Sequence, residues 1–199
     1  MSERLLVFTG RPNSGKSTII RLMTGIKTRS GKRPGTTRRI LTYQVGKHLS
    51  LVDMPGYGRI SGAPKRQEGR IKDEIIDFIE TRGRDIAVAV HVLDVSTFRE
   101  VSRRLERKGF IPIDLEMIQF ITENTQDALV IAANKIDKIR GDPQPLLNET
   151  FESIVGMIPP GTEIAMYPVS GRTGEGVGEL KAAVVRKLVE KGLRAPFRM

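Results

Sequence analysis

A glycine-rich segment near the start of the chain, residues 10–17, combines the groups that a phosphate-binding loop needs. It reads Gly10-Arg11-Pro12-Asn13-Ser14-Gly15-Lys16-Ser17 and lies between an apolar run, residues 5–8, and a predicted helix, residues 16–23. Its glycines allow successive backbone N–H groups to turn inward around phosphate oxygens, at the positive end of the following helix. Lys16 is placed to reach the β- and γ-phosphates, and the Ser17 hydroxyl to ligate magnesium. The segment is therefore predicted to be a P-loop, with nucleotide-binding residues from Gly10 to Thr18.

A second candidate segment, Asp53-Met54-Pro55-Gly56, directly follows a predicted strand, residues 49–52. An acid at this place can hold Mg²⁺ through water, and the Gly56 backbone N–H can meet the γ-phosphate and respond to its loss. Alone, such a pattern is more often an ordinary turn, but its position after the P-loop favours a nucleotide site. We expect Asp53, Pro55 and Gly56 to contribute to it.

The identity of the base is predicted by Asn134-Lys135-Ile136-Asp137, at the end of another apolar run. The Asp137 carboxylate can accept hydrogen bonds from the ring N–H and the exocyclic amine of guanine, a donor pair that adenine does not offer. Unpaired buried polar groups reject a wrong ligand by large factors. We expect Asn134 to tie this loop to the P-loop and the Lys135 stem to lie along the base. The segment Ser170-Gly171-Arg172 would then present a backbone N–H to guanine O6.

Between these motifs lies Gly35-Thr36-Thr37, in a loop rich in basic residues. A GTPase needs a threonine in this loop whose hydroxyl and carbonyl reach magnesium and the γ-phosphate in the GTP state. We choose Thr37, with Thr36 as the alternative, and count Gly35 among the nucleotide contacts. The expected catalytic residues are Lys16, Thr37 and Gly56, and the expected magnesium ligands are Ser17, Thr37 and Asp53.

The elements that must position these motifs alternate between strands and helices. Strands are predicted at 5–8, 40–45, 49–52, 86–95, 128–133 and 164–169, and helical segments at 16–23, around 71–79, 101–107, from 113, 149–157 and 177–191. This order indicates an α/β fold with a mostly parallel sheet and helices on both faces. Together with the motifs, it predicts a Ras-like P-loop GTPase domain with a six-stranded sheet and about five helices. Ligands bind beyond the carboxyl ends of such strands, where every motif falls. A single domain, residues 1–199, is expected.

Composition narrows the setting and the partners. The chain has no Cys and no apolar run long enough to span a bilayer, so we expect a cytoplasmic protein without a membrane span or a signal peptide. The formal charge of +10 lies wholly in residues 1–52, which hold eleven basic residues and one acidic residue. Such a field favours a polyanionic partner, with nucleic acid the commonest candidate. The alternative is that nucleotide phosphates and general solubility account for the charge.

Together these motifs resemble the Era, EngA, MnmE and EngB group of GTPases, and most closely the EngB family. The discriminating string is Asp53-Met54-Pro55-Gly56-Tyr57-Gly58, supported by Gly35-Thr36-Thr37-Arg38 and by residues 113–117, which read Ile-Asp-Leu-Glu-Met. Bacterial members usually carry Thr where Asn134 stands, and the segment 98–113 is longer and more basic than theirs. The resemblance covers essentially the whole chain and indicates an archaeal-type member.

The resemblance implies two mechanistic points. Tyr57 stands where many signalling GTPases place a water-orienting Gln, so hydrolysis by that route is not expected, although a packed aromatic is the alternative reading. Asn13 matches the P-loop asparagine that helps relatives such as MnmE to bind potassium beside the phosphates. Since Asn is also a common turn residue, K⁺ activation remains an open alternative. His91, in an apolar strand, is expected to be a core residue rather than a ligand.

The predicted activity is slow hydrolysis of GTP to GDP and phosphate by a monomeric, Mg²⁺-dependent switch. The family resemblance implies a role in large ribosomal subunit assembly, with ribosomal RNA as the partner. We further hypothesise that GTP orders a basic surface carried by Lys27, Arg29, Lys32, Arg33, Arg38 and Arg39. Two alternatives stay open: a cell division or septation factor, or scaffold, with negligible turnover, and a nucleotide kinase, against which residues 134–137 argue.

Overall fold

Six strands form one sheet with the order β2-β3-β1-β4-β5-β6. The computed structural model describes residues 3–28, 39–58, 65–125, 129–194 and 197. All neighbouring strands pair in parallel except β2 and β3, which form an antiparallel pair. The sheet is therefore mostly parallel, as predicted, and the carboxyl ends of its five parallel strands share one edge. The strands are β1 (Arg4–Thr9), β2 (Leu41–Gly46), β3 (Leu49–Asp53), β4 (Ile86–Asp94), β5 (Leu129–Asn134) and β6 (Ala165–Val169).

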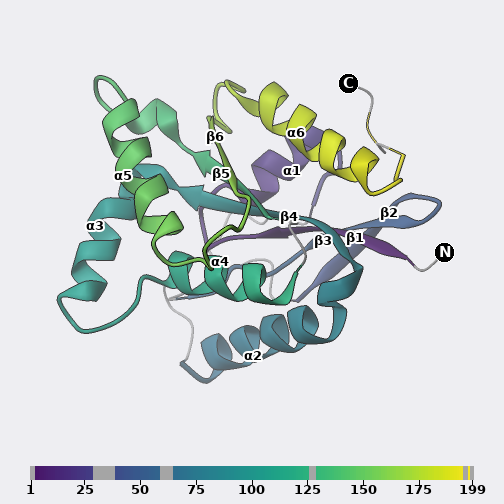
Figure 1. Ribbon diagram of the computed structural model, residues 1–199, viewed down its shortest axis with the longest axis horizontal. Helices are drawn as coiled ribbons and strands as arrows, with labels where there is room; N and C mark the ends of the chain where they lie inside the picture. The colour runs from purple at the N-terminus through teal and green to yellow at the C-terminus, as the bar shows by residue number, and fades with distance from the viewer. Residues whose placement is uncertain (1–2, 29–38, 59–64, 126–128, 195–196, 198–199) are drawn as a thin grey trace.

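Helices cover both faces of this sheet (Figure 1). α1 and α6 lie on one side, and α2 and α4 lie on the other, with α3 and α5 beside the β5–β6 half. The described residues contain six α-helices and two short 3₁₀ turns, compared with the expected five or so helices. They are α1 (Lys16–Thr24), α2 (Lys65–Arg82), η1 (Gly83–Asp85), α3 (Val95–Glu106), α4 (Ile113–Asn124), η2 (Ile136–Lys138), α5 (Gln144–Val155) and α6 (Val177–Glu190).

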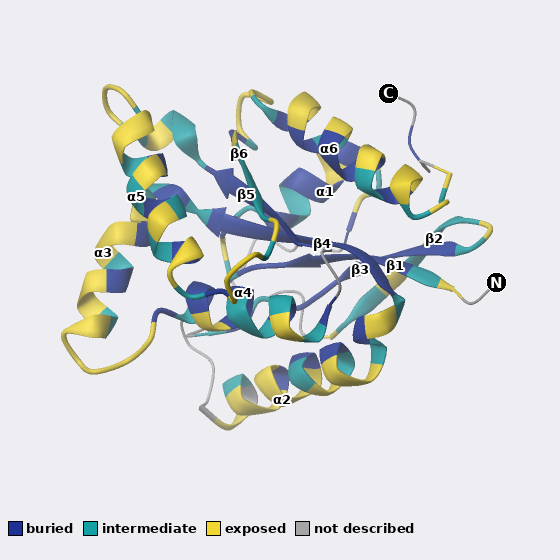
Figure 2. Ribbon diagram, in the orientation of Figure 1, coloured by how far each residue is buried: buried dark blue, intermediate teal, exposed yellow. Residues whose placement is uncertain are grey.

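The described residues form two large hydrophobic cores, one on each face of the sheet, and a small cluster of Val95, Ala133 and Leu147. Ile19 and Ile20 of α1 and Leu180 of α6 pack with the β1 and β4 side chains that face them. Ile75 of α2 and Ile118 of α4 pack into the second core on the opposite face. The central strands β4 and β5 are buried on both sides, which explains why their sequences are continuous apolar runs rather than alternating ones (Figure 2).

Two predicted boundaries are displaced. The strand β4 ends at Asp94, and α3 begins at Val95 instead of near Val101, because the buried side chains of Val95 and Phe98 belong to the first turns of the helix. A continuous apolar run does not show where a buried strand passes into a helix. α5 begins at Gln144, five residues before its predicted start, since a proline in the first turn does not interrupt a helix.

None of the helices in the described part of the chain combines the length and the apolarity needed to cross a bilayer.

Candidate functional site

The P-loop connects the buried strand β1 to the first turn of α1. Gly10, Asn13 and Gly15 have positive φ angles of 148°, 65° and 96°, and they turn the backbone back on itself between strand and helix. A side chain at Gly15 is excluded also by space, because a Cβ there would lie 2.2 Å from the amide nitrogen of Asn134. The loop therefore presents its backbone N–H groups at the N-terminus of α1, where phosphate oxygens bind favourably.

Lys16 and Asp53 form a buried ion pair at the base of this loop. Burial lowers the pKa of the Lys16 ammonium below its ordinary value, and the charge of Asp53 opposes part of that shift. One carboxylate oxygen of Asp53, Oδ2, is buried and has no hydrogen-bond partner among the described residues. The half-buried Ser17 lies next to Lys16 in the first turn of α1, followed by Thr18. The unpartnered Asp53 oxygen and the Ser17 hydroxyl are both hard oxygen ligands of the kind that Mg²⁺ prefers.

The segment after β3 lies directly against the P-loop. Met54 donates its backbone N–H to the Phe8 carbonyl at 3.1 Å, which extends the pairing of β3 with β1. Pro55 is buried, and Gly56 is packed so closely that a Cβ on it would lie 2.8 Å from the backbone nitrogen of Pro12. The Gly56 backbone is thus held beside the loop that would hold the phosphates.

Asn134 joins three segments at the end of β5. Its side-chain nitrogen donates to the Ser14 carbonyl at 2.7 Å, and its side-chain oxygen accepts the Gly171 backbone N–H at 2.8 Å. Asp137 accepts a hydrogen bond from the Ser170 hydroxyl at 2.6 Å. The P-loop and the two segments 134–137 and 170–172 therefore form one connected surface.

A cavity of about 250 Å³ opens on this surface. The Asp137 carboxylate lies at its wall, and the 3.9 Å ion pair between Arg172 and Asp137 leaves the Arg172 side chain largely exposed. A planar base with two adjacent N–H donors can pair with a carboxylate in this position. The lining residues are Gly15, Thr18, Asn134, Lys135, Asp137, Lys138, Gly171 and Arg172.

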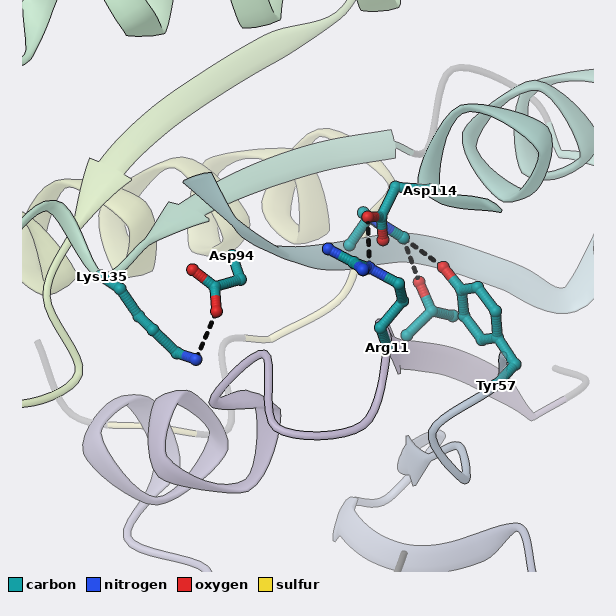
Figure 3. Close-up of polar contacts among 7 residues, drawn as sticks. Arg11, Tyr57, Asp94, Asp114 and Lys135 are labelled. Carbon is teal, nitrogen blue, oxygen red and sulfur yellow. Dashed lines mark hydrogen bonds and ion pairs between the residues drawn. The ribbon is translucent and has the colours of Figure 1, made fainter. Parts of the chain in front are cut away.

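Lys135 and Asp94 form an ion pair at the same edge of the sheet (Figure 3). Lys135 has a left-handed φ of 72°, and its stem borders the cavity. Sequence reasoning did not include Asp94 or Lys138 in the site. Asp94 could have been found, because it ends β4 opposite Asn134 and so belongs to the same carboxyl edge.

A second polar cluster lies on the other side of the P-loop and was also missed. We call it the His91 cluster; its members are Thr9, Arg11, Tyr57, His91 and Asp114. Arg11, Tyr57 and Asp114 converge from three segments, apart from the Lys135–Asp94 pair (Figure 3). The expectation that His91 is a core residue is confirmed, since the side chain is fully buried. The sequence did not indicate that its two ring nitrogens have polar partners.

Tyr57 points into this cluster and not into the nucleotide cavity. Only 3% of the residue is exposed, and its hydroxyl lies 3.4 Å from His91 Nδ1. Burial, and to a lesser degree the charge of Asp114, raise the pKa of the Tyr57 hydroxyl well above its ordinary value. Tyr57 is therefore a packed aromatic side chain in this structure. Its hydroxyl points toward His91 and away from the nucleotide cavity, so it is not placed to orient a water molecule there.

The structure brings most of the predicted residues to one edge of the sheet. Residues 10–18, 53–56, 134–137 and 170–172 line this edge, while Gly35, Thr36 and Thr37 lie outside the described residues. Asn13 is exposed at the outer bend of the P-loop. The arrangement can hold phosphates at the N-terminus of α1, a cation near Ser17 and Asp53, and a base beside Asp137.

Comparisons with known proteins agree with this chemistry. A family model described as 50S ribosome-binding GTPase matches residues 5–135. The probable GTP-binding protein EngB of Methanopyrus kandleri is 40% identical over 94% of this chain and 93% of its own length. The EngB protein of Archaeoglobus fulgidus is 38% identical over 98% of this chain and 96% of its own. A crystal structure of a probable GTP-binding protein engB, 36% identical, superposes with a TM-score of 0.80 over 94% of this chain and 99% of that one.

Proposed function

The chain belongs to the EngB family of P-loop GTPases, and on this premise we propose that it binds GTP at the P-loop edge and hydrolyses it to GDP and phosphate. The observation that carries the proposal is the three-way junction at Asn134, which joins the P-loop to the segments with Asp137 and Gly171. A ligand that fills both the phosphate loop and the adjoining cavity must carry phosphates at one end and a base at the other. Asp137 selects guanine among such nucleotides.

Magnesium would be held by Ser17 and, through water, by Asp53, with Thr37 joining them in the GTP state. The buried Asp53 Oδ2, which has no partner among the described residues, supports this assignment. Bound Mg²⁺ would supply positive charge that offsets the negative charge developing on the phosphate oxygens. When phosphates arrive, Lys16 exchanges its ion pair with Asp53 for contacts to their oxygens. The buried ammonium then has an anionic partner at the reaction centre.

Hydrolysis in this mechanism uses fixed donors and no water-orienting side chain at position 57. Gly56 would give its backbone N–H to the γ-phosphate, Lys16 its charge, and Thr37 its hydroxyl and carbonyl. The exposed Asn13 would offer its side-chain oxygen to a potassium ion beside the phosphates, supplying charge that other GTPases take from an arginine. A low rate without a partner follows, because none of these groups positions the attacking water.

The physiological role we propose is that of a switch in large ribosomal subunit assembly, with ribosomal RNA as the partner. Its support is the positive charge of residues 1–52 and the description of the matching family model. A further exposed group at the end of α3 has the same sign: Arg104, Arg107 and Lys108 have no ion-pair partner among the described residues. Phe110, which follows shortly after them, is 62% exposed. Cations beside an exposed aromatic ring suit a nucleic-acid strand.

Single-turnover hydrolysis tests the proposal. Mg²⁺ and GTP should yield GDP and phosphate, faster with purified large ribosomal particles present. If Asn13 holds potassium, replacing KCl by NaCl at equal ionic strength should slow the reaction, and Asn13→Ala should remove the difference. Tight GTP binding with no turnover, with or without particles, would instead support a GTP-binding scaffold.

A further inference from the structure

The His91 cluster connects five parts of the fold, one of which is the P-loop itself. Thr9 ends β1, Arg11 lies in the P-loop, and Tyr57 follows Gly56, while His91 and Asp114 come from β4 and from the first turn of α4. The Thr9 hydroxyl lies 3.0 Å from His91 Nδ1, and the Tyr57 hydroxyl lies 3.4 Å from the same atom. On the other side of the ring, His91 Nε2 lies 3.3 Å from Asp114 Oδ1. The second oxygen of Asp114 pairs with Arg11 Nε at 2.6 Å.

The chemistry of these partners defines the direction of the contacts. A carboxylate can only accept a hydrogen bond, so His91 Nε2 carries a proton and donates it to Asp114. The Nδ1 atom of a neutral ring is then the acceptor for the two hydroxyl groups. Tyr57, whose raised pKa keeps it protonated, remains a donor.

Burial makes this cluster resistant to rearrangement. Tyr57, His91 and Asp114 are each at most 3% exposed. A buried polar group that loses its partner is strongly unfavourable, and here each partner comes from a different segment. Moving the residue after Gly56 therefore takes the Tyr57 hydroxyl away from His91, and moving the P-loop at Arg11 leaves the second oxygen of Asp114 without its partner.

Two members of the cluster, Tyr57 and Arg11, are chain neighbours of residues beside the proposed phosphate site. Gly56 is next to Tyr57 in the chain and packs against the backbone of Pro12, which is next to Arg11. Anchoring Tyr57 on His91 and Arg11 on Asp114 thus fixes the distance between the Gly56 backbone and the phosphate loop. A shift of either anchor would change the direction of the Gly56 N–H relative to the γ-phosphate.

We propose that His91 and Asp114 are positioning residues for GTP hydrolysis, which hold Tyr57 and Arg11 so that the Gly56 N–H meets the γ-phosphate. The proposal rests on the GTPase mechanism given above. It assigns Tyr57 a role as an anchor of Gly56. A cluster that served stability alone would have no effect on the discrimination between GTP and GDP, because only GTP has the phosphate that Gly56 contacts.

The variants Tyr57→Phe and Asp114→Asn test this proposal, with Tyr167→Phe on β6 and Asp73→Asn on α2 as matched controls. Affinities for GTP and GDP and single-turnover rates are measured below the lowest melting temperature of the set. Both test variants should hydrolyse GTP about tenfold more slowly, while GDP affinity changes less than about threefold, because the donor is misdirected but not removed. The ratio of GTP to GDP affinity should fall, and both controls should match the wild type.

A double variant gives a second readout. Arg11 and Tyr57 are joined through Asp114 and His91, so Arg11→Lys combined with Tyr57→Phe should slow hydrolysis by less than the product of the two single effects. Independent effects, or variants that melt earlier but keep the wild-type rate and the wild-type GTP to GDP ratio, would overturn the positioning role. If the wild type itself releases no phosphate from GTP, the proposed function fails. The ratio of GTP to GDP affinity in Tyr57→Phe then shows by itself whether the cluster positions Gly56: a ratio equal to that of the wild type would overturn the positioning role.

Discussion

At the residue scale, the proposed choice of guanine depends on a single carboxylate. Asp137 borders the cavity and already accepts a hydrogen bond from Ser170, which holds the carboxylate in place before a ligand arrives. Its remaining lone pairs face a site where a base can bind. A base without two neighbouring donors would leave this carboxylate partly unpaired.

Asp137→Asn should therefore weaken GTP binding by about 10²- to 10³-fold, since the amide keeps one acceptor and loses the other. The amide nitrogen can instead donate to the carbonyl that xanthine carries in place of the guanine amine, so XTP affinity should rise. Isothermal titration with GTP and XTP measures both. Asp73→Asn, on the exposed face of α2, is the control. Equal GTP affinity in the variant and the wild type would exclude Asp137 as the base reader.

Tyr57 gives the protein a pH dependence that can be measured without a nucleotide. Its pKa is raised in the folded state, so above the unfolded value of about 10 the unfolded chain loses a proton that the folded chain keeps. The stabilising contribution is complete below that pH and is lost as the pH rises through the folded pKa. The free energy of unfolding should thus decrease from about pH 9.5 to about pH 11 more steeply in the wild type than in Tyr57→Phe. Parallel curves in denaturant titrations would contradict the buried state of Tyr57.

At the scale of elements, the turn into α6 positions the segment 170–172, which we propose faces the base. Gly176 caps α6 with a φ of 70°, and a Cβ on it would lie 2.0 Å from the Pro168 carbonyl oxygen. A Cβ on Gly178, two residues later and inside the helix, would instead point into open space. The two glycines are thus a matched pair in opposite environments.

Gly176→Ala should lower the free energy of unfolding by roughly 2 kcal/mol or more, since left-handed backbone and a clash with a carbonyl act together. Gly178→Ala should leave it unchanged or raise it by up to about 1 kcal/mol, because alanine is the better helix former. Equilibrium unfolding in urea measures both changes. A similar effect of the two substitutions would show that the turn before α6 is not fixed as described.

The sequence predicted the order of strands and helices because buried parallel strands read as apolar runs between glycine-rich loops. It also predicted which segments meet, since motifs at the carboxyl ends of parallel strands share an edge. It could not predict the His91 cluster, because contacts such as that between Thr9 and His91 join residues 82 positions apart that show no motif spacing. The start of α3 was missed for a related reason, because Val95 and Phe98 are apolar in either element.

At the scale of the whole molecule, positive charge is unevenly distributed along the chain. The excess of positive charge lies in residues 1–52, the same part of the chain that carries the P-loop. A polyanionic partner would therefore bind beside the nucleotide site. Such binding releases counterions and should weaken steeply as salt increases.

Reversing the charge at Arg29, Lys32 and Arg33 should reduce co-sedimentation with large ribosomal particles in the GTP state. GTP affinity should be kept, because none of these three side chains is among the base and phosphate contacts proposed above. Arg186→Glu, on the exposed face of α6, controls for charge reversal outside the proposed basic surface. Particle binding that is equal in the triple variant and the wild type at each salt concentration would contradict the proposed basic surface.

The central claim is a guanine-specific hydrolase at the P-loop edge, and phosphate release from GTP and from ATP under single-turnover conditions tests it most directly. With Mg²⁺ and excess protein, the account predicts that GTP is converted to GDP and phosphate while ATP is left intact. Equal release from both nucleotides, or release from ATP alone, would contradict it.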